Sequence, residues 1–533
     1  MIQGYWIPIL HSHLPFVKHP KYENFLEEHW LFEAITECYI PLLRRLYLME
    51  SENIPFKLTL SITPPLAEML DDAHLMNKYT NYLDKAIQLG QKEVMRTQNN
   101  EEYASIAQFY KDFFSQTKTF FEEVLHHNVL NGYRHFYDKG DIEIITCGAT
   151  HGFLPLLSVN EKAVEVQIKI AVQAHIKHFN KAPKGIWLPE CAYYKGLDKL
   201  LRQNNIEFFI ADSHALIYAD PTAINGVYAP VYTPEQIAVF GRDAFSSKQV
   251  WSSKEGYPGD FNYRDFYRDI GYDLEFEYIK PYINPDGTRV FTGYKYHKIT
   301  NQSDHKEVYN PKIAALKTQE HAKHFHTQRE KQIAQLAPLL ERTPMIVSPY
   351  DAELFGHWWF EGPEFLYQLF SYMYEANVIK PITPVEYLSM YPKNQVVDPS
   401  ASSWGDKGYY DVWLNGSNAW IYRHLHGMAD AMCHYANVYE TCNNNEQIRV
   451  LNQMLRELLL AQSSDWAFLM TTQTATQYSV NRTKEHIHNF HTLKAMLDDN
   501  KLNFDILTQL EYKNSIFDFI DYKIFLGEQR TYD

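Results

Sequence analysis

Disulfide pairs, long apolar runs and an excess of basic residues are all missing from this sequence, and each absence excludes a class of protein. The five cysteines are widely spread and include no C-x-x-C pair, so we expect free thiols in a reducing compartment: Cys38, Cys147, Cys191, Cys433 and Cys442. No apolar run approaches the roughly 18 residues of a membrane-spanning helix. The first residues, MIQGYWIPILHSHLPF, lack the basic start of a signal peptide. A cytoplasmic protein without a membrane partner is therefore expected.

Basic residues are outnumbered by acidic ones, 50 to 65, which gives a formal charge of −15. Because phosphate contacts rely on clustered lysine and arginine, this balance disfavours nucleic acid as a partner. Aromatic residues make up 15% of the chain, more than a core requires. A neutral ligand bound in a cleft or on a surface rich in aromatics is easier to reconcile with this composition.

Short apolar segments recur along the chain, and most are separated by helical patterns. With 533 residues the chain is too long for one compact core, so two or three packed units are expected. The segments predict strands at residues 5–10, 57–62, 142–147, 185–188, 207–211 and 344–347. Such alternation is typical of a β/α architecture with parallel strands. Polar residues cluster after the strands, where β/α barrels build their sites.

Two long stretches depart from this alternation. Residues 71–140 are amphipathic, with Phe109, Phe113, Phe120 and Val124 at near-helical spacing, which predicts a small helical insertion. After residue 397 a turn-rich stretch leads into helical patterns that continue nearly to the last residue. We therefore predict a barrel at residues 1–70 and 141–397, the insertion at 71–140 and a helical C-terminal domain at 398–533.

Residues 226–300 contain few regular patterns and many Tyr, Gly, Pro and Asp residues. Loops of this length inside compact domains are usually functional, so the segment could cover a cleft. It could equally be a surface excursion packed by its own aromatic side chains.

The stretch 348–365, SPYDAELFGHWWFEGPEF, concentrates acids and aromatics directly after a predicted strand. Carboxyl groups that hold or donate protons lie there beside flat rings that stack on sugars, which suggests a sugar-binding cleft. The alternative is a structural corner, because Asp and Glu after a strand often cap the next helix.

Three histidines follow predicted strands. Since residues two apart on a strand point to the same side, His11 and His13 can face one ligand, and His151 follows the third strand. Zinc coordination, hydrogen bonding to sugar hydroxyls and a purely structural role all stay open on this spacing.

Glu190 comes directly after an apolar strand and Pro189. The proline fixes the turn, which would hold a nucleophile rigidly. A salt bridge to a neighbouring loop is the simpler alternative, and Cys191 is more consistent with a packed, inert thiol than with a nucleophile. Asp351 follows another strand on the same expected face. Two carboxyl groups that flank one bond are what glycoside cleavage needs.

Five motifs carry a resemblance to a known family: HSHLPF from His11, DIEIITCGATHGFLPLL from Asp141, GIWLPECAYY from Gly185, SPYDAELFGHWWFEGPEFL from Ser348 and SSDWAFLM from Ser463. In this order they resemble glycoside hydrolase family 57 and, within it, the 1,4-α-glucan branching enzymes. The resemblance spans nearly the whole chain.

This resemblance implies an α/β fold, an incomplete (β/α)7 TIM-like barrel with a helical insertion and a C-terminal α-helical domain. It implies that Glu190 is the nucleophile and Asp351 the general acid/base. It also implies that the following residues bind substrate: His11, His13, His151, Tyr232, Arg264, Trp404, Trp413 and Asp465. Tyr232 would belong to a mobile loop, TPEQIAVFGRD, over the site. The chain departs from the family at two places. Family members usually carry Gly-Val near Gln236-Ile237, and they often have a tryptophan near the position of Tyr272.

The implied activity is cleavage of an α-1,4-glucan and transfer of the chain to a 6-hydroxyl, forming α-1,6 branches with retention of configuration. The partner is α-glucan, with no cofactor, metal or nucleic acid, and a monomer is slightly favoured. An α-amylase or a 4-α-glucanotransferase of the same family is the alternative. A zinc-dependent hydrolase or deacetylase built on the three histidines is a more distant one.

Overall fold

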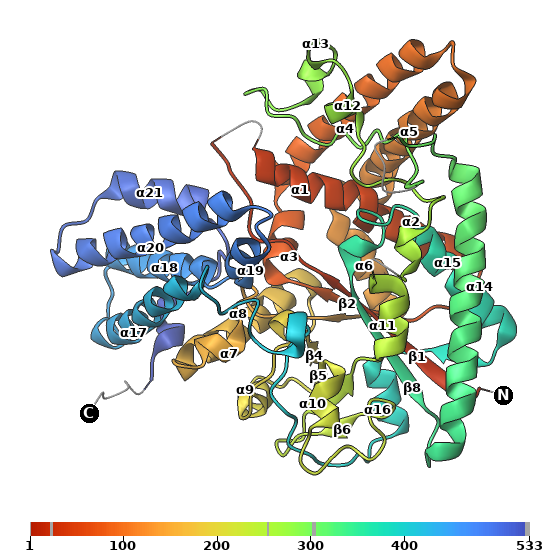
Figure 1. Cartoon of the computed structure of the whole chain (residues 1–533). Helices are drawn as coiled ribbons and strands as arrows, with labels where there is room; N and C mark the ends of the chain where they lie inside the picture. Colours follow the sequence, from red (N-terminus) through yellow and green to blue (C-terminus); the bar gives the residue numbers. More distant parts are fainter. Residues whose placement is uncertain (1, 22–24, 253–254, 301–304, 528–533) are drawn as a thin grey trace.

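The computed structural model describes residues 2–21, 25–252, 255–300 and 305–527. Figure 1 shows parallel strands in the middle of the molecule, with a pair of long helices beyond one side of them and the C-terminal helices, in blue, beyond another. The chain thus has an α/β fold with a helical C-terminal region.

Among the described residues the strands form two sheets. The first has the order β3-β2-β1-β8, β9 also pairs with β1, and every pair is parallel. Its strands are β1 (Gly4–Ser12), β2 (Leu58–Ile62), β3 (Ile142–Ile145), β8 (Met345–Asp351) and β9 (Ile379–Pro381). The second has the order β4-β5-β7-β6, and only β6 is antiparallel to its neighbour: β4 (Gly185–Ile186), β5 (Phe208–Ala211), β6 (Val231–Tyr232) and β7 (Ala238–Gly241).

Backbone hydrogen bonds join the two sheets at both edges. The Trp187 amide donates to the Thr146 carbonyl at 2.8 Å, and the Asp243 amide donates to the Val347 carbonyl at 2.9 Å. A Cβ atom at Gly185 would lie 2.2 Å from the Phe208 ring, so glycine is required where β4 approaches β5. The parallel strands of both sheets therefore share one interior.

The alternation of side chains along β1 separates two hydrophobic cores. Ile7 and Ile9 belong to an inner cluster that also takes residues from β5, β7 and β8, whereas Trp6 and Leu10 pack into the outer core against the helices. Because alternate residues of a strand share a face, His11 lies on the same side as Ile7 and Ile9. Asp351 likewise shares a face with Met345 and Val347, which belong to the inner cluster.

Helices cover the outer face of the strands and build the two helical regions. Those associated with the strands are α1 (Leu26–Ala34), α2 (Ile40–Ser51), α3 (Pro64–Leu70), α7 (Leu154–Leu157), α8 (Glu161–Phe179), α9 (Leu197–Gln203), α10 (Ser213–Ile217), α11 (Ala244–Trp251), α12 (Ile270–Asp273), α13 (Phe276–Ile279), α14 (Pro311–Leu336), α15 (Gly362–Ala376) and α16 (Pro384–Met390). Among the described helices, none combines the length and the apolar character needed to cross a membrane.

The region predicted as a helical insertion contains α4 (Ala73–Thr97), α5 (Glu101–Thr119) and α6 (Val129–Lys139). Asp72 and Asn100 cap the first two by accepting backbone N–H groups. The predicted apolar stripe is one residue out of phase. Tyr110 and Phe114 are buried, whereas the neighbouring Phe109 and Phe113 are only partly covered.

All six strands expected from the sequence are present, with ends that differ by a few residues. Helical patterns after residue 419 correspond to α17 (Tyr422–Val438), α18 (Asn445–Ala461), α19 (Ser464–Thr472), α20 (Thr476–Asp498) and α21 (Phe504–Lys513). The last six residues of the predicted C-terminal domain lie outside the described residues. The strands missed by the sequence patterns are the two- to four-residue strands β6, β7 and β9.

Glu457 holds the C-terminal helices together from a fully buried position. Its carboxylate is 2.7 Å from His486 Nδ1 and accepts from the side-chain amides of Asn514 at 2.8 Å and Gln453 at 2.9 Å. Burial alone would raise its pKa, but these contacts lower the pKa below the ordinary value. The carboxylate therefore stabilises the folded protein above the unfolded-state pKa, and this contribution is lost as pH falls through the lower folded-state pKa.

We expect Glu457→Ala to lower the free energy of unfolding by about 3–5 kcal/mol, because it leaves buried donors without an acceptor. Urea unfolding at neutral pH, followed by far-UV circular dichroism, measures the effect. Glu440→Ala, at an exposed position, is the control and should leave the midpoint unchanged. An equal midpoint for Glu457→Ala and the wild type would contradict the assigned role.

Candidate active site

The predicted carboxylates lie at the carboxyl ends of parallel strands, on the side to which His11 also points. Glu190 stands in a single turn, Pro189–Cys191, that follows β4, and Asp351 ends β8 directly opposite His11 of β1. Carboxyl ends of parallel strands meet at one edge, so loops from distant parts of the chain converge there.

Glu190 is held by its backbone and by both carboxylate oxygens. Its φ of 62° is in the left-handed region, which is uncommon for a residue with a side chain. The Trp404 indole N–H donates to Oε2 at 2.9 Å and the Ser464 hydroxyl donates to Oε1 at 2.9 Å. Burial raises the Glu190 pKa, and these two donors oppose that rise by stabilising the ionised form.

Asp351 has a different environment. Within the described part of the chain, no side-chain hydrogen bond to its carboxyl group is found. Burial raises its pKa well above the ordinary value, and the negative charges of Glu353 and Glu190 raise it further; Arg242 acts in the opposite direction. The pKa of both carboxyl groups is thus raised, but only Glu190 has hydrogen-bond donors that favour its ionised form. Asp351 is therefore the better suited of the two to hold a proton.

Two of the three predicted histidines, His11 and His151, form a hydrogen-bonded chain that ends at Glu190. His11 Nδ1 is 3.0 Å from Ser61 Oγ, His11 Nε2 is 3.0 Å from His151 Nε2, and His151 Nδ1 is 2.8 Å from Ser464 Oγ. Ser464 donates its proton to Glu190, so it accepts from His151 Nδ1–H. His151 Nε2 then accepts from His11 Nε2–H, and His11 Nδ1 accepts from Ser61.

This assignment needs both rings to be neutral. Burial lowers the pKa values of His11 and His151 well below the ordinary histidine value, and the neighbouring histidines lower them further. The chain therefore delivers a fixed hydrogen-bond donor to the carboxylate of Glu190 without adding a charge.

His13 has a different partner. Its Nε2 is 3.0 Å from Asp465 Oδ2, its Nδ1 is 3.0 Å from Thr63 Oγ1, and its ring stacks on His151 at 3.9 Å between centroids. Its backbone N–H donates to Glu353 at 3.1 Å, and the Tyr39 hydroxyl donates to the same oxygen at 2.5 Å. Glu353, two residues after Asp351, thus fixes the end of β1.

Trp404 forms the aromatic side of the site, and the fully buried Trp187 supports it. Trp187 stacks on His11 at 4.5 Å with an angle of 8° between the ring planes, and its ring meets that of Trp404 edge-on at 4.9 Å. Trp413, which we predicted to be a second wall of the groove, is only 1% exposed and stacks on Phe153 at 4.6 Å. The prediction for Trp413 is wrong, because a ring enclosed on all sides supports the loop and offers no face to a ligand.

Tyr232 lies at the other end of the strands, so its prediction as part of a lid is also wrong. It pairs with Ala238 at the start of β7, and its hydroxyl donates to the Pro392 carbonyl at 3.4 Å. The TPEQIAVFGRD segment contains the turn between β6 and β7 and the whole of β7, so it forms part of a hairpin and not a cover over the site. Its last residues, Arg242 and Asp243, are the part that reaches the carboxyl ends.

Arg264 was also predicted to bind substrate, but its guanidinium is buried away from the carboxylates. It donates to Glu37 at 2.8 Å and to the His357 carbonyl at 3.3 Å, and it covers the ring of Phe360 at 4.1 Å. A direct contact with substrate is excluded by this enclosure. Arg264 supports the loop that follows Asp351.

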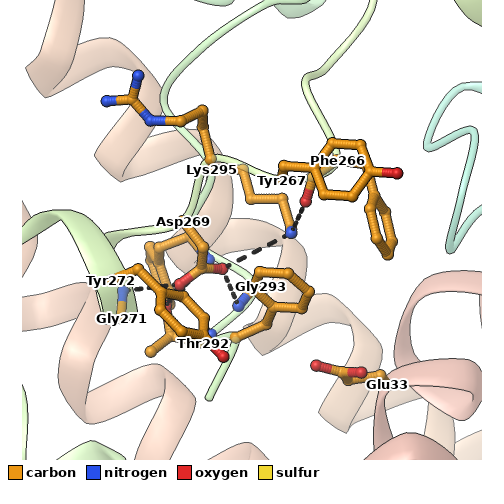
Figure 2. Close-up of polar contacts among 12 residues, drawn as sticks. Glu33, Phe266, Tyr267, Asp269, Gly271, Tyr272, Thr292, Gly293 and Lys295 are labelled. Atoms are coloured by element: carbon orange, nitrogen blue, oxygen red, sulfur yellow. Dashed lines mark hydrogen bonds and ion pairs between the residues drawn. The ribbon is translucent and has the colours of Figure 1, made fainter. Parts of the chain in front are cut away.

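The long segment 226–300 divides into two parts. Figure 2 shows Asp269 and Lys295 pointing toward each other, with Nζ and Oδ2 4.0 Å apart, while Asp269 accepts the backbone N–H groups of Gly271 at 2.8 Å and Thr292 at 2.9 Å. Lys295 also donates to the Phe266 carbonyl. This part is a surface excursion held by a buried ion pair.

That excursion packs on the helical insertion, since the Tyr294 hydroxyl donates to the Ala86 carbonyl at 2.7 Å. The earlier part of the segment differs, because Arg242 and α11 border the site. Residues 253–254, which follow α11, lie outside the described residues. The hypothesis of a surface excursion therefore describes the later part of the segment, and the hypothesis of a segment at the cleft describes the earlier part.

Among the described residues, two groups of side chains have metal-binding spacing, with donor atoms within 4.8 Å of one another: His11, Cys147 and His151, and His13, His151 and Asp465. All six ring nitrogens of the three histidines already lie within hydrogen-bond distance of a partner. A zinc ion would have to displace several of these contacts. The donor set therefore fits a hydrogen-bonded network better than a zinc site.

Ser464, Arg242 and Trp251 were not singled out from the sequence. Ser464 adjoins Asp465 in the SSDWAFLM motif, so its place could have been found from that motif. Arg242 is the last residue but one of the TPEQIAVFGRD segment, whereas Tyr232, which we singled out from the sequence, lies just before the start of that segment. Nothing in the sequence pattern around Trp251 separates it from a core aromatic.

Family models match most of the chain. A model of glycosyl hydrolase family 57 matches residues 7–400, and a model described as the C-terminal part of 1,4-alpha-glucan branching enzyme matches residues 424–525. A 1,4-alpha-glucan branching enzyme of Thermococcus kodakarensis is 30% identical over 97% of this chain and 78% of its own length.

Two solved structures resemble the whole chain. A protein described as a novel alpha-amylase from Thermotoga maritima is 45% identical, with a TM-score of 0.92 over 98% of this chain and 99% of that one. A family 57 branching enzyme from Pyrococcus horikoshii is 31% identical, with a TM-score of 0.89 over 99% of this chain and 98% of that one.

Proposed function

The chain belongs to glycosyl hydrolase family 57, and we propose that it is a 1,4-α-glucan branching enzyme that works by a retaining double displacement. The observation that carries the mechanism is the asymmetry of the two carboxyl groups. Glu190 receives two hydrogen-bond donors that favour its ionised form, whereas Asp351 has a pKa raised well above its ordinary value. Retaining glycosidases need one such nucleophile and one such acid.

In the first step, Asp351 gives its proton to the glycosidic oxygen while a carboxylate oxygen of Glu190 attacks the anomeric carbon. The carbon–oxygen bond breaks, and the chain becomes esterified to Glu190. Asp351, now ionised, then removes the proton from the 6-hydroxyl of an acceptor glucan. That oxygen attacks the anomeric carbon, an α-1,6 bond forms and Glu190 leaves as a carboxylate.

The finer description of the fold is also a proposal. Reading β1, β2, β3, β4, β5, β7 and β8 as an incomplete (β/α)7 barrel is supported by the backbone hydrogen bonds that join the two sheets. The domain limits at residues 1–70 and 141–397, 71–140 and 398–533, a monomer and a cytoplasmic location belong to the same proposal. The free cysteines among the described residues support a reducing compartment.

Product analysis tests the activity. After incubation with amylose, treatment with isoamylase should release new short chains, because isoamylase cuts only α-1,6 bonds. The alternative, an α-amylase, has its own support in the 45% identical Thermotoga protein. It would give reducing ends without chains that isoamylase can release, and that result would reject branching.

Ser464→Ala is expected to shift the acidic limb of the pH–rate profile upward. The hydroxyl lowers the Glu190 pKa, so its loss raises that pKa and Glu190 ionises only at higher pH. Because a hydrogen bond to a charged group contributes about 1.5–3 kcal/mol, a shift of about one to two pH units is expected. The profile of kcat/KM on maltohexaose measures it, with the exposed Ser417→Ala as control. A downward shift, or none, would contradict the chain of hydrogen bonds.

Metal removal is expected to leave the rate on amylose unchanged, because the histidine nitrogens are engaged in hydrogen bonds. Dialysis against a chelator, with metal content measured by mass spectrometry before and after, provides the test. Activity that is lost on dialysis and restored by zinc would favour the zinc hydrolase alternative.

A further inference from the structure

A cavity of about 300 Å³ lies beside the catalytic centre, between the carboxyl ends of β5 and β7 and the helix α11. Its lining includes Asp212, Arg242, Ser247 and Trp251. None of these residues has a role in the chemistry proposed above. The volume is at the lower end of the range for small-ligand sites, which is enough for about one sugar ring with part of a second.

Trp404 connects this cavity to Glu190. Its indole N–H donates to Glu190 Oε2, while its ring lies 6.0 Å from the Arg242 guanidinium and meets the Trp251 ring edge-on at 6.2 Å. The other oxygen of Glu190 faces Ser464 and His151. The cavity, through Trp404, and the Ser464–His151 pair are therefore linked to different oxygens of the Glu190 carboxylate.

Asp351 lies near enough to Arg242, in the cavity lining, for the guanidinium charge to act on the Asp351 carboxyl group and oppose the rise of its pKa. The amide of Asp243, next to Arg242, donates to the carbonyl of Val347, four residues before Asp351 on β8. In the proposed reaction the general acid/base protonates the departing oxygen and later deprotonates the incoming one. Both of these oxygens belong to the sugar on the acceptor side of the cleaved bond.

The chemistry of the lining suits a neutral, hydroxyl-rich ligand. Arg242 donates to Ser247 at 2.9 Å and to Asp212 at 3.2 Å, so its charge is already balanced. Lys248 at the rim is paired with Glu255 at 2.9 Å. A phosphate would find no unpaired cation in this lining, whereas sugar hydroxyls could bond both to the carboxylate and to the guanidinium. Trp251 is 39% exposed and offers part of its ring for stacking.

We propose that this cavity binds the acceptor-side sugar, and that Arg242 and Trp251 decide how well a glucan competes with water for the glycosyl-enzyme. The inference rests on the proposed function, since it assumes that Glu190 carries the transferred chain. In this proposal the donor chain lies on the side of Glu190 that faces Ser464 and His151. The leaving and incoming chains lie on the side that faces Trp404 and Trp251.

The test uses α-maltosyl fluoride as donor, because its fluoride leaving group places no sugar on the acceptor side. Maltotriose is added as acceptor at increasing concentration. Trp251→Ala is expected to raise the acceptor KM at least about tenfold and to lower the ratio of transfer to hydrolysis, since a lost stacking contact of about 1.4 kcal/mol corresponds to tenfold in binding. Trp251→Phe should recover most of the loss.

Two further variants separate this effect from misfolding. Ala244→Trp should partly fill the cavity from an exposed position and raise the acceptor KM in the same way. Phe245→Ala removes an aromatic ring from the same helix at a position that is 68% exposed and outside the lining, and should behave as wild type. Thermal melting of each variant reports on folding. An unchanged acceptor KM in folded Trp251→Ala and Ala244→Trp would overturn the proposal.

Failure of the proposed function gives a different result. Linkage analysis of the products reports whether transfer makes α-1,6 bonds, and it is independent of the acceptor KM. If the enzyme only hydrolyses, the cavity should still bind the leaving chain of maltohexaose, whereas maltosyl fluoride places no sugar there. Trp251→Ala should then lower kcat/KM for maltohexaose at least about tenfold more than it lowers kcat/KM for maltosyl fluoride. Equal losses on the two substrates would then reject the cavity as the acceptor-side site.

Discussion

Glu190→Gln should reduce the rate of amylose cleavage at least about 10³-fold, because the amide that replaces the carboxylate cannot form the glycosyl ester. The variant should still fold, since glutamine keeps the size of the side chain and one oxygen that accepts a hydrogen bond. The rate of maltosyl fluoride cleavage should fall equally, because this substrate also needs the nucleophile. Both rates are measured at saturating substrate, by reducing ends for amylose and by fluoride release for the fluoride.

Glu207→Gln, an exposed position just before β5, is the matched control and should retain full activity. A sharper test uses Glu190→Ala with added azide. Azide can enter the space left by the carboxylate and attack the anomeric carbon, giving a glycosyl azide of inverted configuration. A product of retained configuration would show that Glu190 is the acid/base and reverse our assignment.

Asp351→Asn should reduce amylose cleavage by a similar factor but affect maltosyl fluoride much less. An alkoxide leaves poorly without a proton, whereas fluoride needs little assistance, so only the first substrate depends on the acid in its first step. Because burial and the neighbouring carboxylates raise the Asp351 pKa well above the ordinary value, the wild type should keep this proton to a higher pH than an exposed aspartate would. Activity should then fall as pH rises through that pKa, and the variant should lose this alkaline limb.

The comparison of the two substrates identifies the role of Asp351. Asp406→Asn changes an exposed aspartate and should leave both rates unchanged. Equal losses on amylose and on maltosyl fluoride would show that Asp351 does not act as the acid. The two carboxyl groups interact, so the limbs of the pH profile belong to the pair and not to either residue alone.

The parts of the fold that the sequence predicted are those with strong alternation. Ile7, Ile9 and His11 occupy alternate positions of one strand, so the direction of the first histidine followed from its apolar neighbours. The short strand β7 has four residues, and nothing in them distinguishes a strand from a buried turn. Its role in joining the sheets depends on hydrogen bonds to residues far away in the sequence.

The site was predictable where a residue follows a strand directly, as Glu190 and Asp351 do. Tyr232 was misplaced because sequence order does not say at which end of a strand a hairpin lies. Trp413 was wrongly predicted to contact substrate because its spacing from Trp404 is compatible with two arrangements. The ring could form an exposed wall of the groove, or it could be buried and stacked on Phe153, as the structure has it. Ser464 was overlooked because its importance comes from two partners, Glu190 and His151, that lie hundreds of residues earlier.

The position of β1 between β2 and β8 has a consequence for biosynthesis. The backbone of His13 and the carboxylate of Glu353, which close the end of β1, are 340 residues apart. At a translation rate of about 5–20 residues per second, β1 waits on the order of 20–70 s for β8 to be made. During that time one edge of an apolar strand has no partner and can pair with another chain. Nascent chains that stall before β8 should therefore aggregate or depend on chaperones, and no fragment lacking β8 should be active.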